Sequence, residues 1–410
     1  MSQIIFNAII AIILFNYLLD RILHYLNQKS YSTRLPKEAE GIYDEEKYKK
    51  SQEYHKASDR FSFLTSTFNL MLILGMLFFN GFAWVDNFAR SYTDNPILIA
   101  IIFFGILGLA SDILSIPFDL YDTFVIEERF GFNKTTPKTY ILDKLKGYVL
   151  SAIIGGGVLA LIVWIYYSTG EFFWLYAWGA VSLFMILATM FYASVILPLF
   201  NKLTPLPEGE LRTAIENYCK KAGFKLDNLY VMDGSKRSSK ANAFFSGLGA
   251  KKRIVLYDTL IEKHTTEELV AVLAHEIGHY KKKHTLTAIV LSILQTGLML
   301  FILSYFIQSP ELSAALGVAE PSFHIGILAF GLLYSPLSII LDLGMNLLSR
   351  KNEYEADRYA KETYSAASLQ QALKKLSVDN LSNLTPHPAY VFFYYSHPPL
   401  LKRLKALEGK

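Results

Sequence analysis

Residues 325–348 read IGILAFGLLYSPLSIILDLGMNLL, an almost unbroken run of apolar side chains. A helix of about 20 apolar residues spans the hydrocarbon core of a bilayer, so this run predicts a membrane-crossing helix. Similar runs occur six more times along the chain, at about residues 3–26, 62–85, 96–118, 147–168, 172–199 and 286–307. The sequence therefore predicts an α-helical integral membrane protein with seven transmembrane helices.

The composition agrees with a membrane protein and argues against other classes. Hydrophobic residues make up 52% of the 410-residue chain and charged residues 19%, which is unusual for a soluble domain. The first apolar run has no basic leader and no small-residue cleavage site, so we expect a retained span and not a signal peptide. The net charge of +4 is mild, so the lipid bilayer, and not nucleic acid, is the expected partner. The single cysteine, Cys219, cannot form an internal disulfide and is expected to be inert.

Basic residues alternate between the connections that join the seven runs. The first connection carries eight Lys or Arg between Lys29 and Arg60 and the third carries five, whereas the second has only Arg90. The fourth and sixth have none, and the fifth, residues 201–285, is rich in them. By the positive-inside rule, the odd connections and the C-terminal tail are cytoplasmic and the N-terminus lies outside.

Residues 275–279 read HEIGH, within a stretch of helix-favouring residues that begins after Thr265. Side chains four residues apart on a helix lie on one face about 6 Å apart, so His275 and His279 can bind one Zn²⁺. Glu276, turned by one residue, can reach a water molecule activated by the metal and act as the catalytic base. The motif therefore predicts a zinc site that hydrolyses peptide bonds.

A catalytic zinc needs a third protein ligand and an open fourth position. The sixth span leaves the HExxH helix and the seventh returns to the same side, which brings residues 349–357, SRKNEYEAD, to that surface. Glu353 and Asp357 share a helical face, so Glu353 can bind zinc while Asp357 accepts the free N–H of a ligating histidine. Glu355 points elsewhere, and His284 is a rival third ligand.

Two further segments could complete the site. His397 and Arg403 lie in residues 396–404, SHPPLLKRL, where two prolines fix the start of a C-terminal helix. His397 could donate to a developing oxyanion, and Arg403 could orient a carboxylate or buttress the site; a capping turn with a surface arginine is the alternative. The run from Asn242 to Ser246, NAFFS, could be an edge strand that binds an extended substrate, or a buried internal strand.

These features divide the chain into four parts. Residues 1–200 hold spans one to five, and residues 286–348 hold spans six and seven. Residues 201–285 are expected to form a cytoplasmic-side α+β zinc peptidase unit, and residues 349–410 the C-terminal part of the active site. Within the α+β unit we expect helices at about 208–222 and 266–283, and strands at about 229–232, 241–245 and 253–257.

Asp112 and Asp342 fall inside or beside apolar runs. A carboxylate that faced lipid would cost at least roughly 2–3 kcal/mol, so both should face the protein. The alternatives are a hydrogen-bonded packing contact and a water-filled chamber between the spans.

These motifs resemble the integral-membrane type I CAAX prenyl endopeptidases, relatives of the smaller HtpX-like quality-control peptidases. The resemblance covers nearly the whole chain. Five segments carry it, namely HEIGHYKKKH (275–284), SRKNEYEAD (349–357), SHPPLLKRL (396–404), IPFDLYDTFVIEERFGFNKTT (116–136) and PLFNKLTPLPEGEL (198–211). The last two distinguish the chain from the HtpX-like group, which has a shorter chain and fewer spans.

The resemblance implies seven spans around a large internal chamber, with one Zn²⁺ site that faces the chamber near its cytoplasmic side. It implies that Glu353 is the third ligand and that Asp357 lies behind the ligands. It also implies that His397 and Arg403 are active-site groups and that Asn242 contacts the substrate backbone.

The implied substrate is a peptide or protein, with or without a prenyl group, and the implied reaction removes the residues that follow a prenylated cysteine. One alternative is general proteolysis of membrane proteins in an HtpX-like role. Another is a binding protein or transporter with a structural zinc, which would need a fourth protein ligand. The membrane would be the inner or plasma membrane in a bacterium and the endoplasmic reticulum in a eukaryote. Lys240 departs from the family pattern, where histidine is common, and has no assigned role.

Overall fold

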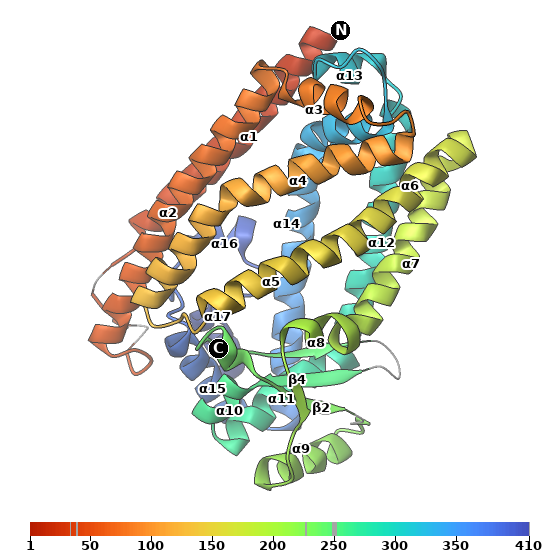
Figure 1. Cartoon of the computed structure of the whole chain (residues 1–410). Coiled ribbons are helices and arrows are strands. Elements are labelled where there is room, and N and C mark those ends of the chain that lie inside the picture. The colour runs from red at the N-terminus through yellow and green to blue at the C-terminus, as the bar shows by residue number, and fades with distance from the viewer. Residues whose placement is uncertain (33, 38–39, 226–227, 248–251, 410) are drawn as a thin grey trace.

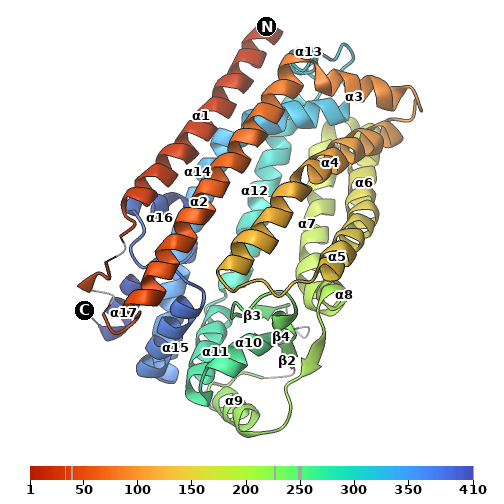
Figure 2. The ribbon, with the colours of Figure 1, turned by 60° about the vertical axis from the view of Figure 1, so that its left-hand side comes forward.

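The structure is a computed structural model that describes residues 1–32, 34–37, 40–225, 228–247 and 252–409. Its long helices run between two ends of the molecule, with the N-terminus at one end and a small sheet at the other (Figures 1 and 2). The long helices are α1 Ser2–Lys29, α2 Glu45–Phe78, α4 Pro96–Tyr121, α5 Pro137–Leu150, α6 Gly156–Thr169, α7 Phe173–Phe191, α12 His284–Phe306 and α14 Phe323–Thr363.

Six helical segments in the described part of the chain are long and apolar enough to cross a membrane. The chain is therefore a multi-pass integral membrane protein. Each of the seven predicted runs overlaps one of these segments. The numbers differ because the fourth and fifth runs both lie in the single segment Pro137–Phe200. Within that segment a 3₁₀ turn at Gly170–Phe172 separates α6 from α7, which lie side by side in both views (Figures 1 and 2).

The second predicted run, residues 62–85, is wrong at its C-terminal end. α2 ends at Phe78, and the short helix α3 Gly81–Arg90 follows in a different direction. Asn80 causes the turn because it adopts a left-handed conformation, with φ 54°, which asparagine tolerates better than most residues. The apolar side chains after the turn, such as Phe82, join Leu312 of α13 Pro310–Ala315 in a buried cluster and do not prolong the span.

α14 combines a membrane span and part of the site in one helix. It contains 41 residues, which is about 60 Å at 1.5 Å per residue and roughly twice the hydrocarbon thickness. Its first half is apolar, and its second half carries Glu353 and Asp357, which are 4% and 2% exposed. One continuous helix therefore brings both carboxylates from the membrane to the α+β unit, as the order of the spans predicted.

The α+β unit contains a sheet of strand order β1-β2-β4-β3. β2 and β4 are parallel, and the outer strands pair antiparallel with them. The three predicted strands and both predicted helices are present, whereas β1 and α10 were not predicted. The elements are β1 Leu203–Pro205, α9 Glu210–Lys221, β2 Leu229–Met232, β3 Ala243–Ser246, β4 Arg253–Tyr257, α10 Asp258–Lys263 and α11 Thr266–Lys281. In the sheet formed by the described residues β3 is an edge strand, so the internal-strand alternative is wrong there.

The core of this unit lies between the sheet and α11. Leu256 of β4 and Leu269 and Leu273 of α11 are each at most 2% exposed and belong to one cluster. Cys219 of α9 is buried in the same cluster, and burial raises the pKa of its thiol to about 11. The thiol stays protonated near neutral pH, in agreement with the expected inert role.

Asp112 pairs with polar side chains of a neighbouring helix, as expected for a carboxylate that faces the protein. It accepts hydrogen bonds from Lys144 Nζ (2.7 Å) and Tyr148 Oη (2.6 Å) of α5, and it lines a cavity of about 910 Å³ between α4, α5 and α6. Asp342 lines a separate cavity of about 350 Å³ together with Asp20. Asp112 therefore has both a packed polar contact and a neighbouring cavity.

Candidate metal centre

α11 carries the HExxH motif, and its start is set by local hydrogen bonds. Thr265 Oγ1 accepts from the backbone N–H of Glu268 (3.3 Å), and Glu268 Oε2 accepts from the backbone N–H of Thr265 (3.0 Å). This reciprocal capping box satisfies two of the free N–H groups of the first turn. Most of α11 is buried, so the motif is held on a helix with little freedom to move.

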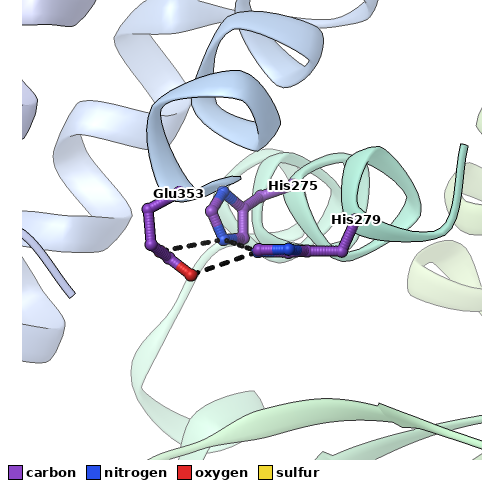
Figure 3. Close-up of side chains that lie close together, drawn as sticks. All are labelled: His275, His279 and Glu353. Carbon is purple, nitrogen blue, oxygen red and sulfur yellow. Dashed lines mark hydrogen bonds and ion pairs between the residues drawn. The ribbon is translucent and has the colours of Figure 1, made fainter. Parts of the chain in front are cut away.

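His275 and His279 lie one turn apart on α11 and face Glu353 of α14 (Figure 3). Their two Nε2 atoms are 3.1 Å apart. Glu353 Oε1 is 3.2 Å from Nε2 of His279, and Glu353 Oε2 is 3.5 Å from Nε2 of His275. One possible ligand atom from each of His275, His279 and Glu353 lies within 4.8 Å of the other two, so these residues could hold a metal ion. They form the one such group found among the described residues.

The donor set fits a divalent metal ion. Among the described residues, Oε2 of Glu353 is buried without a hydrogen-bond partner, and its ion-pair contacts with His275 and Arg403 are longer, at 3.5 and 3.3 Å. Burial lowers the pKa of His275, but its hydrogen bonds with Asp357 and Glu353 outweigh this effect and raise the pKa to about 9. The carboxylates that raise this pKa also attract a metal cation, which would displace the proton from His275. Three protein ligands would leave one position open for substrate or water.

Asp357 and Arg403 form a second layer behind the three possible metal ligands. Asp357 Oδ1 is 2.9 Å from Nδ1 of His275, so the carboxylate can accept that N–H and direct Nε2 towards the metal. Arg403 donates to both carboxylate oxygens of Asp357, at 2.6 and 2.8 Å, and its Nη1 is 3.3 Å from Glu353 Oε2. Because Arg403 is only 9% exposed, the geometry favours the buttressing role over contact with a substrate carboxylate.

His284 lies behind His279 and outside the metal group. Its Nδ1 is 3.0 Å from Nδ1 of His279, and its Nε2 is 3.2 Å from Glu355 Oε2. If His279 binds metal through Nε2, its Nδ1–H can donate to His284, which can donate in turn to Glu355. From the sequence His284 is expected only as a rival ligand, and its supporting contact with His279 is not predicted. The contact between His284 and His279 depends on the turn at Lys283, which has φ 60°.

One cavity of about 500 Å³ brings together the predicted site residues other than Asp357. The polar residues that line it are Asn242, His275, Glu276, His279, Glu353, His397 and Arg403. Burial raises the pKa of Glu276 above that of an ordinary glutamate, as expected for a general base. Nε2 of His397 lies 3.3 Å from Glu353 Oε1, and its side chain is 64% exposed. The three possible metal ligands, the expected base Glu276 and residues of the edge strand therefore line the same cavity.

Gly278 sets the distance between α11 and α14. A Cβ added there would lie 3.1 Å from Ala356 Cα and 3.2 Å from Ala356 O. We expect Gly278→Ala to push the two helices apart, to destabilise the protein by about 1–3 kcal/mol and to weaken metal binding. Thermal unfolding and metal titration would measure both effects. Gly344→Ala on α14 is the control, because a Cβ there meets nothing within 4 Å, and an unchanged metal affinity in Gly278→Ala would contradict the prediction.

Comparison with known proteins decides the family. Residues 205–410 match the model of peptidase family M48, and residues 24–202 match the model described as CAAX prenyl protease N-terminal, five membrane helices. The chain belongs to peptidase family M48. It is therefore a membrane metallopeptidase, and the resemblance found in the sequence is confirmed.

Relatives of this M48 chain are similar over most of their length. The chain is 38% identical to the probable CAAX prenyl protease 1 of Schizosaccharomyces pombe, over 89% of this chain and 80% of the relative. It is 37% identical to the CAAX prenyl protease 1 homolog of Arabidopsis thaliana, over 92% and 91%. Its structure matches the crystal structure of S. mikatae Ste24p with a TM-score of 0.94 and 34% identity, over 98% and 99% of the two chains.

Proposed function

We propose that this M48 peptidase is a zinc endopeptidase of the CAAX prenyl protease type, which removes the C-terminal residues that follow a prenylated cysteine. The observation that carries the proposal is the open three-ligand centre, which shares a cavity with Glu276 and the edge strand β3. The curated relatives named CAAX prenyl protease 1 support the substrate class.

The substrate would bind as an added strand along β3. The backbone of an edge strand offers unpaired N–H and C=O groups to an extended peptide. Asn242 lies at the start of β3 and is exposed, with its Oδ1 accepting from the N–H of Ala243 (2.9 Å). Its amide N–H₂ group also interacts with the Tyr257 hydroxyl and would donate to a substrate carbonyl.

The protein groups around the metal divide the chemistry between them. Bound to His275, His279 and Glu353, Zn²⁺ would supply Lewis acidity to the scissile carbonyl and to the attacking water. Glu276 removes a proton from that water and delivers it to the leaving amine. His397, at the opening of the cavity, donates to the carbonyl oxygen as negative charge develops on it. Asp357 and Arg403 act as positioning residues.

We further propose that the active site faces the cytoplasmic side of a chamber between the spans, with the N-terminus outside. The N-terminus and the α+β unit lie at opposite ends of the molecule (Figure 1), which agrees with opposite sides of the membrane. The Lys and Arg residues of the odd connections support the cytoplasmic side for the α+β unit. The membrane would be the endoplasmic reticulum in a eukaryotic source and the inner or plasma membrane in a bacterial one. In this orientation residues 1–200 and 286–348 hold the spans, and residues 201–285 and 349–410 form the cytoplasmic active-site part.

A pair of peptides that differ only in a farnesyl group tests the substrate class. We expect the farnesylated CAAX peptide to be cleaved with a kcat/KM at least about tenfold higher, because burial of a few CH₂ groups already contributes that much. Mass spectrometry of the products gives the cleavage site. Equal rates for both peptides would contradict the prenyl preference and favour the HtpX-like alternative, and cleavage of neither would count against the proposed function.

The structural-zinc alternative requires a fourth protein ligand. In the described part of the chain, the metal group has three members. Asp357 and His284 contact the distal nitrogens of the ligating histidines, so their positions are those of supporting residues. The geometry therefore favours a catalytic metal.

A further inference from the structure

Lys240 lies two residues before Asn242, and its ammonium group is held in a closed polar triangle. Lys240 Nζ donates to Glu127 Oε2 (2.8 Å) and to Tyr54 Oη (3.1 Å). Tyr54 Oη donates in turn to Glu127 Oε1 (2.6 Å). The ammonium also lies 4.3 Å from the centre of the Phe132 ring, within cation–π distance.

All three partners of Lys240 lie in or next to the long helices α2 and α4, outside the α+β unit. Tyr54 belongs to α2, Glu127 ends the π-helical turn Asp122–Glu127 that continues α4, and Phe132 lies in the loop that follows. In that loop Phe132 O accepts from the N–H of Ser239 (3.0 Å). The side chain of Lys240 therefore ties the segment before β3 to the first and third connections of the membrane part.

The backbone on either side of Lys240 is fixed by different elements. Thr259 Oγ1 donates to the carbonyl of Lys240 (2.9 Å), and Asn380 bonds both the N–H and the C=O of Ala241 at 3.2 and 3.3 Å. The next carbonyl, that of Asn242, accepts from the N–H of Tyr257 (3.1 Å), where the pairing of β3 with β4 begins. Among the described residues no strand pairs with the other edge of β3, so these contacts set where the strand starts.

We propose that Lys240 is a positioning residue for substrate, which through Glu127 and Tyr54 fixes the start of β3 relative to the membrane helices. This inference rests on the proposed role of β3 as the strand that binds substrate. Lys240 does not line the 500 Å³ cavity that holds Glu276 and the metal group. Its loss therefore weakens substrate alignment and leaves the metal and the base in place.

The experiment compares Lys240→Gln, Glu127→Gln, the double variant and Lys240→Arg in the full-length enzyme. Because the ion pair is partly exposed (Lys240 36%, Glu127 21%), we expect each Gln variant to raise KM about three- to tenfold. We expect kcat to change less than about twofold and metal content to stay constant. The variants would weaken substrate binding along β3 without altering the metal group or Glu276, and a loss of binding alone appears in KM. The double variant should lose no more than either single variant, because both remove the same contact. Lys240→Arg should retain a KM close to that of the wild type.

Two controls separate this role from others. Glu216→Gln breaks an ion pair of equal length, 2.8 Å, between Arg212 and Glu216 on the exposed face of α9, and it should leave KM unchanged. Asn242→Ala tests the strand itself and should raise KM. If Asn242→Ala raises KM while the Lys240 and Glu127 variants do not, the positioning role of Lys240 is wrong, and the proposed binding of substrate along β3 is retained. Additive losses in the double variant would also refute the coupling. If Asn242→Ala has no effect, the proposed function of β3 fails with it.

Discussion

Replacing Glu276 by glutamine should lower the rate of peptide cleavage by roughly 10²- to 10⁴-fold and leave the metal bound. Glutamine keeps the size and the hydrogen-bonding ability of glutamate but cannot take a proton from water. Glu276 lines the cavity beside the three possible metal ligands and is not one of them. Single-turnover cleavage of a fluorogenic peptide, with metal content measured on the same sample, checks both halves of the prediction.

Glu267→Gln is the matched control for Glu276→Gln. Glu267 lies on the same helix but is exposed in its first turn, so its replacement should leave cleavage unchanged. Activity within a few-fold of wild type in Glu276→Gln would rule out Glu276 as the base. Loss of metal together with activity would instead point to a structural effect of the substitution.

Replacing Glu353 by glutamine should weaken metal binding by more than about 100-fold. Substitution of a residue that only supports a ligand typically lowers metal affinity 10- to 100-fold, so loss of a ligand should exceed that range. Both Glu353 oxygens face the histidine Nε2 atoms, at 3.2 and 3.5 Å. Competition of the purified protein with a chelator of known affinity gives the dissociation constant.

Two neighbours on α14 provide graded comparisons for Glu353→Gln. Asp357→Asn should fall within the 10- to 100-fold range, because Asp357 contacts His275 and not the metal position. Glu355→Gln should have a smaller effect, since Glu355 acts only through His284 and then His279. The ligand assignment would be wrong if Glu355→Gln weakened metal binding more than Glu353→Gln did.

Much of the fold and the centre of the site could be predicted from local sequence patterns. Apolar run length identifies the spans, and the spacing of His275, His279 and Glu276 defines a helix face before any tertiary contact is known. The predicted end of the second span was wrong and β1 was not predicted, because the sequence pattern at both places is weak. Asn80 ends α2 inside an apolar run, and β1 is a three-residue strand that includes Pro205. Neither feature changes the average hydrophobicity or the periodicity of its segment.

The sequence alone determined that the chain crosses a membrane and that His275 and His279 can share a metal, because both conclusions depend on distances within one helix. Only the tertiary structure decided how the site is supported. Arg403 meets Asp357, His284 meets His279 and Lys240 meets Glu127, and no local periodicity encodes these pairs. Their distances depend on how closely separate elements approach, as α11 and α14 do at Gly278. That approach is set by packing across the whole fold.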